Sequence, residues 1–411
     1  MYPCITCLNV NRYNLIKGGH VMKFEQSEAI KRLPEQFFAN LNKRVQQLQR
    51  EGHDVINLGQ GNPDTPTEER IVKALQQAAE DPINHKYPPF QGFPYFKEAV
   101  AQFYEQEYDV SLDPNTEVAL MFGSKIGIFE VVQSLLNPGD TALLPNPGYP
   151  DYLASTALSN IKHEFMPLLA ENGFLPDYES LPQDVVDRAK LMFLNYPNNP
   201  TAAVANTQFY DETVAFAKQN NVFVVHDFAY GAISFDGQKH PSFLQSEGAK
   251  EIGIEMYSMS KTFNMAGWRV AFAVGNSSVI QTINLLQDHL FTSLFGGIQY
   301  AATEAIKGDL SYVDELVAMY ERRRDVFVDH LHRIGWHVEK PGGTFFAWFK
   351  VPDGYTSESF ANLLLEKAHV VVATGNGFGD LGEGYVRIGL LAPEERLIEA
   401  AERIGRLNIF K

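Results

Sequence analysis

Residues 222–230 read Val-Phe-Val-Val-His-Asp-Phe-Ala-Tyr, an apolar run that ends at Asp227 and is followed three residues later by Tyr230. A short run rich in valine and phenylalanine predicts a buried β-strand. A carboxylate at the end of such a strand is costly to bury unless a cation or a ligand pairs with it. The stretch therefore predicts a strand of a buried sheet with a ligand site at its carboxyl end.

Short apolar runs of the same kind recur along the chain, and amphipathic runs separate them. Strands are predicted at residues 117–121, 141–144, 161–166, 190–194, 222–226, 255–258 and 270–274, and helices at 37–50, 68–79, 96–108, 126–136 and 209–219. Strands that alternate with helices predict an α/β fold with a mostly parallel sheet. A second, smaller unit is predicted from a long charged helix and three strands, at 311–334, 345–349, 369–373 and 385–390.

The composition indicates a folded globular protein of two domains. Of its 411 residues, 45% are apolar and 20% are charged, close to the average for such proteins. The formal net charge of −16 disfavours binding to nucleic acids and to anionic membranes. No uncharged apolar run approaches the roughly 18 residues of a membrane-spanning helix. The only two cysteines, Cys4 and Cys7, cannot build a disulfide scaffold, which fits a cytoplasmic protein.

Residues 1–21 differ from the rest of the chain, because they show neither helical nor strand periodicity. Cys4-x-x-Cys7 resembles half of a metal site, but no second cysteine pair or histidine cluster completes it, so no metal is predicted. Lys17-Gly18-Gly19 can be encoded by a bacterial ribosome-binding sequence just upstream of Met22. We therefore expect translation to start at Met22 and residues 1–21 to be an unstructured translated leader.

Three further polar stretches follow predicted strands, at the sheet edge where Asp227 is expected. Gly123-Ser124-Lys125 joins a strand to a helix, whose N-terminal N–H groups favour an anion. Asn198-Asn199-Pro200-Thr201 is a turn that can present an amide side chain to a ligand. Ser258-Met-Ser-Lys261 ends another strand, and Arg269 follows eight residues later. A lysine desolvated at such a place has the lowered pKa that a Schiff-base lysine needs.

Each of these stretches alone is also compatible with an ordinary turn or a surface lysine. Together they describe one ligand, which has an anionic phosphate, a ring nitrogen that pairs with a carboxylate and an aldehyde that bonds an amine. Pyridoxal 5′-phosphate has these three parts, so the sequence predicts this cofactor.

In these motifs the chain resembles the class I/II pyridoxal phosphate-dependent aminotransferases of fold type I. The shared motifs are Asn199-Pro-Thr, Asp227-x-x-Tyr230, Ser258-x-Ser-Lys261 with Arg269, and Tyr385-Val-Arg387-Ile-Gly. The resemblance extends from about residue 28 to 408. It implies a large domain with a mostly parallel, seven-stranded sheet and a smaller α+β domain. We expect an N-terminal arm at 22–60 that shares in the small domain, a large cofactor-binding domain at 61–300 and a small domain at 301–411.

The resemblance also implies how the cofactor ring is held and used. Lys261 would bond the aldehyde and move the proton of the substrate α-carbon, as general base and then acid. Asp227 would keep the ring nitrogen protonated. Tyr230 and Asn199 would hydrogen-bond the ring oxygen, and Tyr149 would stack on the ring.

Further roles implied by the resemblance concern the phosphate and the substrate. The phosphate would be surrounded by Ser124, Lys125, Ser258 and Arg269. Ser124 and Lys125 would bind it largely through their backbone N–H groups. Arg387, with Asn199, would clamp the substrate α-carboxylate, and Gly61 would leave room beside it. Tyr87 would reach the phosphate of a neighbouring subunit, which requires a homodimer with shared active sites.

One position departs from the family's Asn-Pro-Thr-Gly pattern, because Ala202 stands where glycine is usual. Alanine accepts a positive φ less readily than glycine, so we expect a slight tilt of this loop without loss of the chemistry.

A second motif points to a different ligand. Residues 377–382, Gly-Phe-Gly-Asp-Leu-Gly, match the dinucleotide fingerprint G-x-G-x-x-G. A dinucleotide site needs a helix that opens at the last glycine, and a strand is predicted here instead. Nicotinamide binding is therefore not expected.

The residues expected near the substrate side chain favour an apolar substrate. Aspartate-type members of the family carry a second arginine from the partner chain, and residues 287–295, in the corresponding region, contain none. Phe37, Phe38, Phe291 and Phe295 offer an apolar lining, which suits a thioether. The same rings are equally compatible with an ordinary core.

Within the family, the chain most resembles the aminotransferases of bacterial methionine salvage, which convert 4-methylthio-2-oxobutanoate to methionine with an amino-acid donor. Segments 33–38, 52–64, 194–201 and 226–230 carry this resemblance. Three alternatives stay open: an aminotransferase for aromatic or other apolar amino acids, a pyridoxal phosphate-dependent carbon–sulfur β-lyase, and a non-enzymatic regulator. The regulator is disfavoured, because residues 1–21 are too short for a DNA-binding domain and the chain is acidic.

Overall fold

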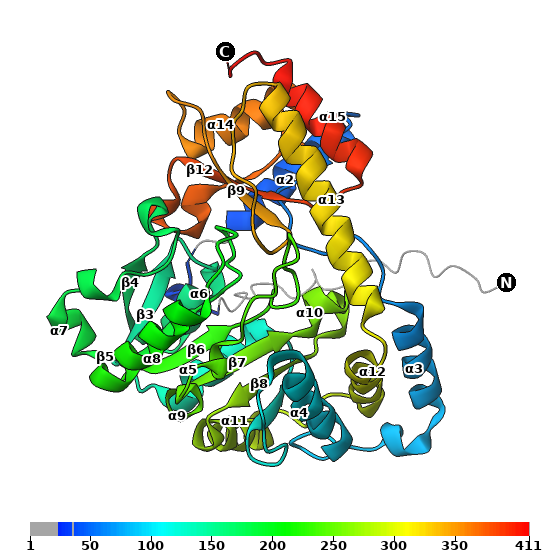
Figure 1. Ribbon diagram of the computed structural model, residues 1–411, viewed down its shortest axis with the longest axis vertical. Helices are drawn as coiled ribbons and strands as arrows, with labels where there is room; N and C mark the ends of the chain where they lie inside the picture. Colours follow the sequence, from blue (N-terminus) through cyan, green and yellow to red (C-terminus); the bar gives the residue numbers. More distant parts are fainter. Residues whose placement is uncertain (1–23, 35–36, 411) are drawn as a thin grey trace, which may run out of the picture.

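The computed structural model describes residues 24–34 and 37–410, with side chains from residue 43 onward in the second range. The predicted leader at 1–21 and the side chains of Phe37 and Phe38 lie outside the described residues. The chain forms a large unit around one sheet and a smaller unit that contains both α2 (Phe37–Arg50) and α15 (Glu394–Gly405) (Figure 1).

The other elements follow in chain order. The remaining helices are α1 (Glu28–Lys31), α3 (Glu69–Glu80), α4 (Pro94–Tyr108), α5 (Ser124–Leu135), α6 (Pro150–Leu158), α7 (Gln183–Val186), α8 (Thr207–Asn220), α9 (Ala249–Ile252), α10 (Met259–Thr262), α11 (Ser277–Leu290), α12 (Gly296–Lys307), α13 (Ser311–Arg333) and α14 (Ser357–Leu363). The strands are β1 (Ile56–Asn57), β2 (Val118–Met121), β3 (Thr141–Asn146), β4 (Lys162–Pro167), β5 (Ala189–Leu194), β6 (Phe223–Asp227), β7 (Gly253–Ser258), β8 (Ala271–Gly275), β9 (Phe346–Lys350), β10 (Val370–Val371), β11 (Ala373–Thr374) and β12 (Tyr385–Gly389).

The seven strands of the large sheet run in the order β2-β8-β7-β6-β5-β3-β4, and the neighbours from β7 to β4 are parallel. Only β8 reverses direction, since it pairs antiparallel with both β2 and β7. This sheet confirms the predicted α/β fold and its mostly parallel, seven-stranded sheet. Because β5, β6 and β7 end at one edge, the polar residues that follow them come together there.

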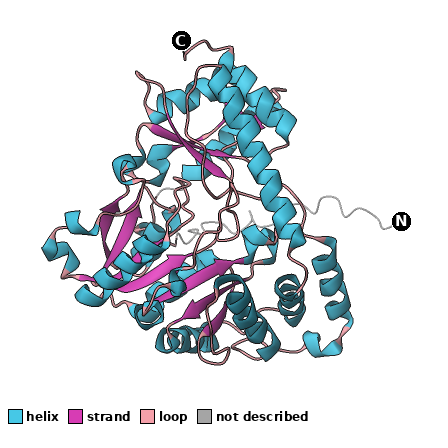
Figure 2. Cartoon of the chain, viewed as in Figure 1, coloured by secondary structure: helices cyan, strands magenta, loops and turns pink. Residues whose placement is uncertain are grey.

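Helices cover both faces of this sheet (Figure 2), and successive side chains of a strand enter different cores. On β5, Leu191 and Phe193 pack with residues of α5, α6 and α11. Met192 and Leu194 pack on the other face with residues of α3, α4, α8 and α12. Both faces of the sheet are therefore buried, which explains why its strands are continuous apolar runs in the sequence.

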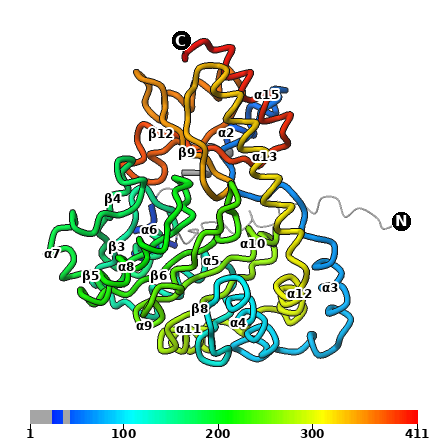
Figure 3. Tube along the Cα trace, in the orientation of Figure 1, coloured from blue at the N-terminus to red at the C-terminus, as the bar shows by residue number. Residues whose placement is uncertain are grey.

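The smaller unit is built around an antiparallel sheet of order β11-β12-β9. The N-terminal segment joins this unit through β1, which pairs parallel with β10. The chain then leaves the unit and runs to α3 in the large one, as the blue trace of Figure 3 shows. Helix α13 contributes to both cores, Val313 to the large and Phe327 to the small one. The boundaries at 60 and 300 therefore stay predictions.

The predicted helices and strands agree with the observed ones to within two residues at each end, except at 369–373. The single strand predicted there was wrong, because the segment forms two short strands in different sheets. β10 pairs with β1, whereas β11 pairs with β12. Pairing with distant segments, and not the local apolar pattern, decides where these strands begin and end.

A buried carboxyl group in α5 makes the stability of the large unit depend on pH. The side chain of Glu130 is fully buried, and its Oε2 accepts a hydrogen bond from Gln287 at 3.1 Å. Its Oε1 has no hydrogen-bond partner in the described part of the chain. Burial raises the pKa of Glu130 from 4.5 to about 7. Its contribution to stability is therefore complete below pH 4.5 and is lost as the pH rises to about 7.

Glu130→Gln should raise the free energy of unfolding at pH 8 by up to about 3 kcal/mol, because the glutamine has no proton to lose. At pH 5 the gain should shrink below about 1 kcal/mol. Denaturant unfolding at the two pH values measures both effects, and Glu105→Gln, at an exposed position of α4, is the control. Equal stability of wild type and Glu130→Gln at pH 8 would contradict this prediction.

Candidate active site

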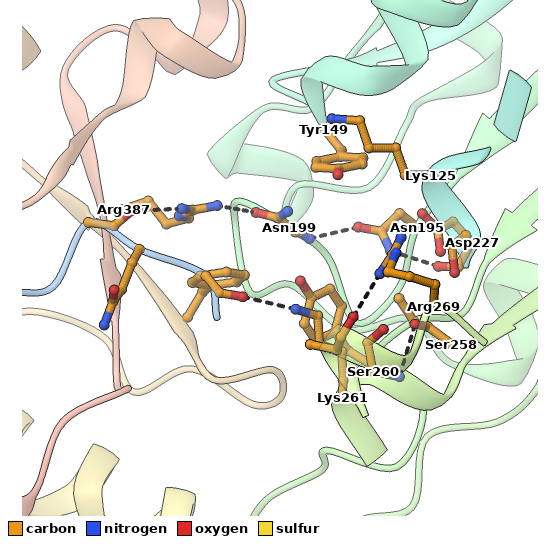
Figure 4. Close-up of a pocket in the computed structure, with 18 of the residues that line it drawn as sticks. Lys125, Tyr149, Asn195, Asn199, Asp227, Ser258, Ser260, Lys261, Arg269 and Arg387 are labelled. Atoms are coloured by element: carbon orange, nitrogen blue, oxygen red, sulfur yellow. Dashed lines mark hydrogen bonds between the residues drawn. The ribbon is translucent and has the colours of Figure 1, made fainter. Parts of the chain in front are cut away.

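A cavity of about 390 Å³ lies where β5, β6 and β7 end, between the large and the small unit. Eleven of the twelve predicted site residues line it: Gly61, Ser124, Lys125, Tyr149, Asn199, Asp227, Tyr230, Ser258, Lys261, Arg269 and Arg387. Figure 4 shows Arg387 entering from the small unit and the other labelled side chains from the large one. The fold therefore assembles residues from both units around one space.

Asp227 ends β6 and is buried at the wall of the cavity. Its Oδ2 accepts a hydrogen bond from the Tyr152 hydroxyl at 3.0 Å, and Asn195 Nδ2 donates to its backbone carbonyl at 2.7 Å. Its Oδ1 is buried and has no hydrogen-bond partner among the described residues. Burial raises the pKa of Asp227 to about 6. A buried carboxylate with one unused oxygen suits a protonated nitrogen of a ligand.

Lys261 enters the cavity from α10, the short helix after β7. Its Nζ donates a hydrogen bond to the Gly61 carbonyl at 2.9 Å and lies 5.2 Å from the centroid of the Phe345 ring. Burial, together with the charges of Arg387 and Arg269, lowers the pKa of Lys261 to about 8. A fraction of this amine is therefore neutral near neutral pH, which is the form that attacks an aldehyde or accepts a proton.

The N-terminus of α5 and the guanidinium of Arg269 form one end of the cavity. Gly123, with a φ of +85°, precedes the helix, and a Cβ atom there would overlap the guanidinium. The Oγ of Ser124 is buried without a hydrogen-bond partner in the described chain. The side chain of Lys125 is engaged elsewhere, because its Nζ pairs with Asp151 at 2.8 Å. Lys125 can therefore offer a ligand its backbone N–H group. Helix N–H groups beside a cation suit a phosphate.

Arg387 lies across the cavity, on the central strand β12 of the small sheet. Its Nη1 donates to Asn199 Oδ1 at 2.8 Å, and its Nη2 donates to the Gly59 carbonyl at 3.1 Å. The backbone N–H of Asn199 donates to Asn195 Oδ1 at 2.7 Å, so hydrogen bonds connect Arg387 through Asn195 to Asp227 (Figure 4). Burial lowers the pKa of Arg387 to about 10, which leaves it charged at neutral pH.

The twelfth predicted site residue, Tyr87, and two residues of the predicted apolar lining, Phe291 and Phe295, do not line the cavity of their own chain. The side chain of Tyr87 is 85% exposed. Phe291 packs against Phe122, with ring centroids 4.9 Å apart, and Phe295 is 40% exposed. The roles predicted for Phe37 and Phe38 lie outside the described residues.

Ala202 adopts a positive φ of 58°, in the position where the family pattern has glycine. This conformation costs an alanine about 1 kcal/mol. The turn nevertheless closes, because the Ala202 N–H donates to the Asn198 carbonyl at 2.9 Å and the Asn198 N–H donates to the Ala203 carbonyl at 2.8 Å. Asn199 therefore still faces Arg387 despite the substitution.

Asn195 and Tyr152, which both hydrogen-bond to Asp227, were not predicted from the sequence. Asn195 directly follows β5, and this position at a strand end was the available signal. Tyr152 lies one helical turn after Tyr149 on α6, where a tyrosine looks like part of an ordinary core. Only the packing of α6 against the sheet brings its hydroxyl to Asp227.

The cavity fits pyridoxal 5′-phosphate. The buried Oδ1 of Asp227 can pair with the ring nitrogen, and the buried Oγ of Ser124 lies where the phosphate would bind. Lys261, with its lowered pKa, can bond the aldehyde. These three groups match the three parts of the cofactor.

Comparisons with known proteins agree with this geometry. A family model described as "Aminotransferase class I and II" matches residues 53–404. The L-glutamine–4-(methylsulfanyl)-2-oxobutanoate aminotransferase of Bacillus subtilis (strain 168) is 60% identical over 389 residues, which cover 95% of this chain and 98% of that protein. The LL-diaminopimelate aminotransferase of Moorella thermoacetica is 45% identical, with 93% and 98% covered. The substrate-bound structure of BacF from Bacillus subtilis has a TM-score of 0.91 and 50% identity, with 95% and 99% covered.

The family match includes all eleven predicted site residues that line the cavity. It confirms the predicted fold type, the reaction class and the cofactor, pyridoxal 5′-phosphate. The chain belongs to the class I and II aminotransferases.

Proposed function

We propose that the protein transfers the amino group of L-glutamine to 4-(methylsulfanyl)-2-oxobutanoate, which yields methionine and the 2-oxo acid of glutamine. The observation that carries this proposal is the 60% identity to the Bacillus subtilis enzyme of that name, over 95% of this chain. The reaction balances, because one amino group and one oxo group are exchanged between two carbon skeletons.

The charges that line the cavity support a substrate with an uncharged side chain. Among the described lining residues, the arginines are Arg269 and Arg387. Arg269 lies beside the N-terminus of α5, where it would bind phosphate, and Arg387 would bind the α-carboxylate. Residues 287–295, the region from which the partner chain would supply an arginine for a side-chain carboxylate, contain none, which disfavours aspartate as the best donor.

When bound, pyridoxal phosphate supplies an aldehyde that carries the amino group and a ring that accepts electrons from the substrate carbon. Lys261 Nζ removes the proton from the substrate α-carbon and returns a proton in the second half of the reaction. The Asp227 carboxylate holds the proton on the ring nitrogen. Arg387 fixes the α-carboxylate, so that the α C–H bond faces Lys261.

Two further side chains would donate to the ring oxygen. Burial raises the pKa of Tyr230, so its hydroxyl keeps its proton and can donate. Asn199 uses its Oδ1 to accept from Arg387, which directs its Nδ2 group to other acceptors. The Tyr149 ring lines the same cavity and would cover one face of the cofactor.

A half-reaction screen tests the proposal. The enzyme in its pyridoxal form is mixed with single amino acids, and absorbance follows its conversion to the pyridoxamine form. We expect fast conversion with methionine and glutamine and slow conversion with aspartate and LL-diaminopimelate. 4-(Methylsulfanyl)-2-oxobutanoate should then restore the pyridoxal form as methionine appears. Preference for LL-diaminopimelate would replace this substrate assignment, and pyruvate release from cystathionine without conversion would indicate a carbon–sulfur β-lyase.

We also propose a homodimer in which each subunit completes the site of the other. Two segments, residues 83–90 and 290–295, expose apolar side chains. They are neighbours, because Asn84 packs against Gly296, which directly follows the second segment. These side chains, each at least 40% exposed, are Ile83, Tyr87, Phe90, Leu290 and Phe295. An apolar patch of this kind marks a protein interface. Tyr87 within it would reach the cofactor phosphate of the partner.

Mixing two variants that each impair one part of the site tests whether the site is shared. Each dimer of a Lys261→Ala chain with a Tyr87→Phe chain contains one site with both defects and one intact site. A 1:1 mixture, after subunit exchange, should therefore recover about a quarter of wild-type activity. Light scattering gives the oligomeric state. A monomer, or a mixture that is no more active than its components, would refute the shared site.

The cysteine content bears on where the protein is located. We infer a cytoplasmic location from the two cysteines in 411 residues. Within residues 24–34 and 37–410, no helix combines the length and hydropathy of a membrane span. In the same residues, no group of three or more acidic, histidine or cysteine side chains is arranged to hold a metal ion.

A further inference from the structure

The glycine-rich stretch 377–382 forms two short 3₁₀ turns that lead into β12, with no helix at its last glycine. Its aromatic residue, Phe378, lies against the substrate-facing arginine, with the Arg387 Cζ 4.7 Å from the ring centroid. The ring of Phe346, on β9, approaches the same Cζ to 4.0 Å. We propose that Phe346 and Phe378 are positioning residues that hold the Arg387 guanidinium in the plane that binds the substrate carboxylate.

The two rings reach Arg387 from the two neighbours of its strand. β12 is the central strand of the small sheet, with β9 on one side and β11 on the other. Phe346 lies on β9, and Phe378 follows β11. Asn199 and Gly59 accept hydrogen bonds from the two terminal nitrogens of the guanidinium. Rings and acceptors together therefore restrict both the position and the rotation of this group.

The burial of Arg387 strengthens the attraction between its guanidinium and the two aromatic rings. Arg387 is 3% exposed, and a cation beside an aromatic face gains more when it is removed from water. Gly61 allows one of these contacts, because a Cβ atom there would lie 3.0 Å from the Phe346 ring. Glycine at this position thus leaves the ring free to lie on the guanidinium.

Contacts between the loop 377–382 and the large unit hold Phe378 in place. The Gly148 N–H donates to the Phe378 carbonyl at 2.8 Å, and the Leu381 N–H donates to Asn146 Oδ1 at 3.2 Å. Gly379 has a φ of +125°, and a Cβ atom there would overlap Asn146. The loop of the small unit can therefore lie against the end of β3 in the large unit. The motif that resembles a dinucleotide fingerprint serves here to dock Phe378.

The inference rests on the proposed role of Arg387 as the carboxylate-binding residue. Phe378→Leu keeps an apolar side chain but removes the aromatic face. We expect it to raise the KM for both the amino acid and the 2-oxo acid about tenfold, with kcat within about twofold. Phe378→Tyr keeps the face and should restore both KM values.

A binding experiment separates positioning from turnover. Calorimetry on the holoenzyme measures the Kd of 3-(methylsulfanyl)propanoate, which has a carboxylate and a thioether but no amino or oxo group. Phe378→Leu should weaken this binding about tenfold, and Phe378→Tyr should not. Leu381→Ala, at a 41% exposed position of the same loop, is the matched control and should bind like wild type. Phe346→Leu gives a second variant, with the same expected loss, in case Phe378→Leu does not fold.

The variant Arg387→Gln separates the positioning role of Phe378 from the carboxylate-binding role of Arg387. Adding Phe378→Leu to Arg387→Gln should cause no further loss of binding, because the ring then has no guanidinium to hold. If the losses of the two single variants add, or if Phe378→Leu binds like wild type while Arg387→Gln does not, the positioning role is wrong and the role of Arg387 stands. If Arg387→Gln itself binds like wild type, the proposed role of Arg387 fails.

Discussion

Replacing Lys261 by alanine should lower kcat for methionine formation by about 10⁴-fold or more, since a positioned proton-transfer group alone contributes up to that factor. Lys261 Nζ lies inside the cavity, where burial lowers its pKa to about 8. The other lysine of the described cavity, Lys125, pairs with Asp151 at 2.8 Å and cannot substitute for it. The steady-state rate of methionine formation, followed by chromatography, measures the loss of kcat.

Lys125→Ala is the matched control, because it removes a lysine of the same cavity but keeps the backbone N–H group. Its kcat should fall by less than about tenfold. The Lys261→Ala variant should melt no lower than wild type, because burying a lysine costs more than burying an alanine. Turnover near the wild-type rate in Lys261→Ala would falsify the assignment of this lysine.

Asp227→Asn should lower kcat/KM by about 10²–10³-fold, the effect of removing one buried, preorganised charge partner. Asparagine has nearly the same shape and can still accept from Tyr152, so the change removes mainly the negative charge. The ring nitrogen then has no carboxylate to keep its proton. Tyr152→Phe keeps the charge and should cost no more than about tenfold. Equal losses in the two variants would show that the charge of Asp227 is not what matters.

The same carboxyl group should make cofactor binding depend on pH. Because burial raises the pKa of Asp227 to about 6, its charge is present above this pH and is lost as the pH falls through it. The affinity of the apoenzyme for pyridoxal phosphate should therefore fall between pH 7.5 and 5.5. The phosphate of the cofactor titrates in the same range, and a falling pH also protonates Lys261, whose pKa is about 8. Asp227→Asn retains both of these effects, so a steeper fall in wild type isolates Asp227, and identical profiles would contradict the prediction.

The local pattern of residues predicted the cofactor chemistry because the chemistry is concentrated in short motifs at strand ends. Asp227 ends an apolar strand, and Lys261 lies three residues after the end of the neighbouring strand, so each is visible within a few residues of sequence. Parallel strands place their carboxyl ends at one edge, which brings such residues together without knowledge of the detailed packing. Arg387 could be assigned only by the resemblance, since it lies 118 positions after Arg269 in the sequence.

Contacts between distant segments were beyond the local pattern. Nothing near Tyr152 in the sequence indicates that its hydroxyl meets Asp227, because the contact depends on how α6 packs on the sheet. Residues 369–373 form two strands for the same reason, since β1 and β12 are different partners. The surroundings of Tyr87 depend on a second chain, so its proposed role stays open to the mixing experiment.

The sequence by itself therefore determined the fold class and the cofactor and predicted the candidate reacting groups, because apolar periodicity and short polar motifs are local properties. The tertiary structure decided which groups hold them: Asn195 and Tyr152 on Asp227, and Phe346 and Phe378 beside Arg387. A glycine-rich stretch with the spacing of a nucleotide motif became a docking loop, because the chain after it pairs as a strand and does not open a helix. These arrangements arise from long-range packing, which residue spacing alone does not encode.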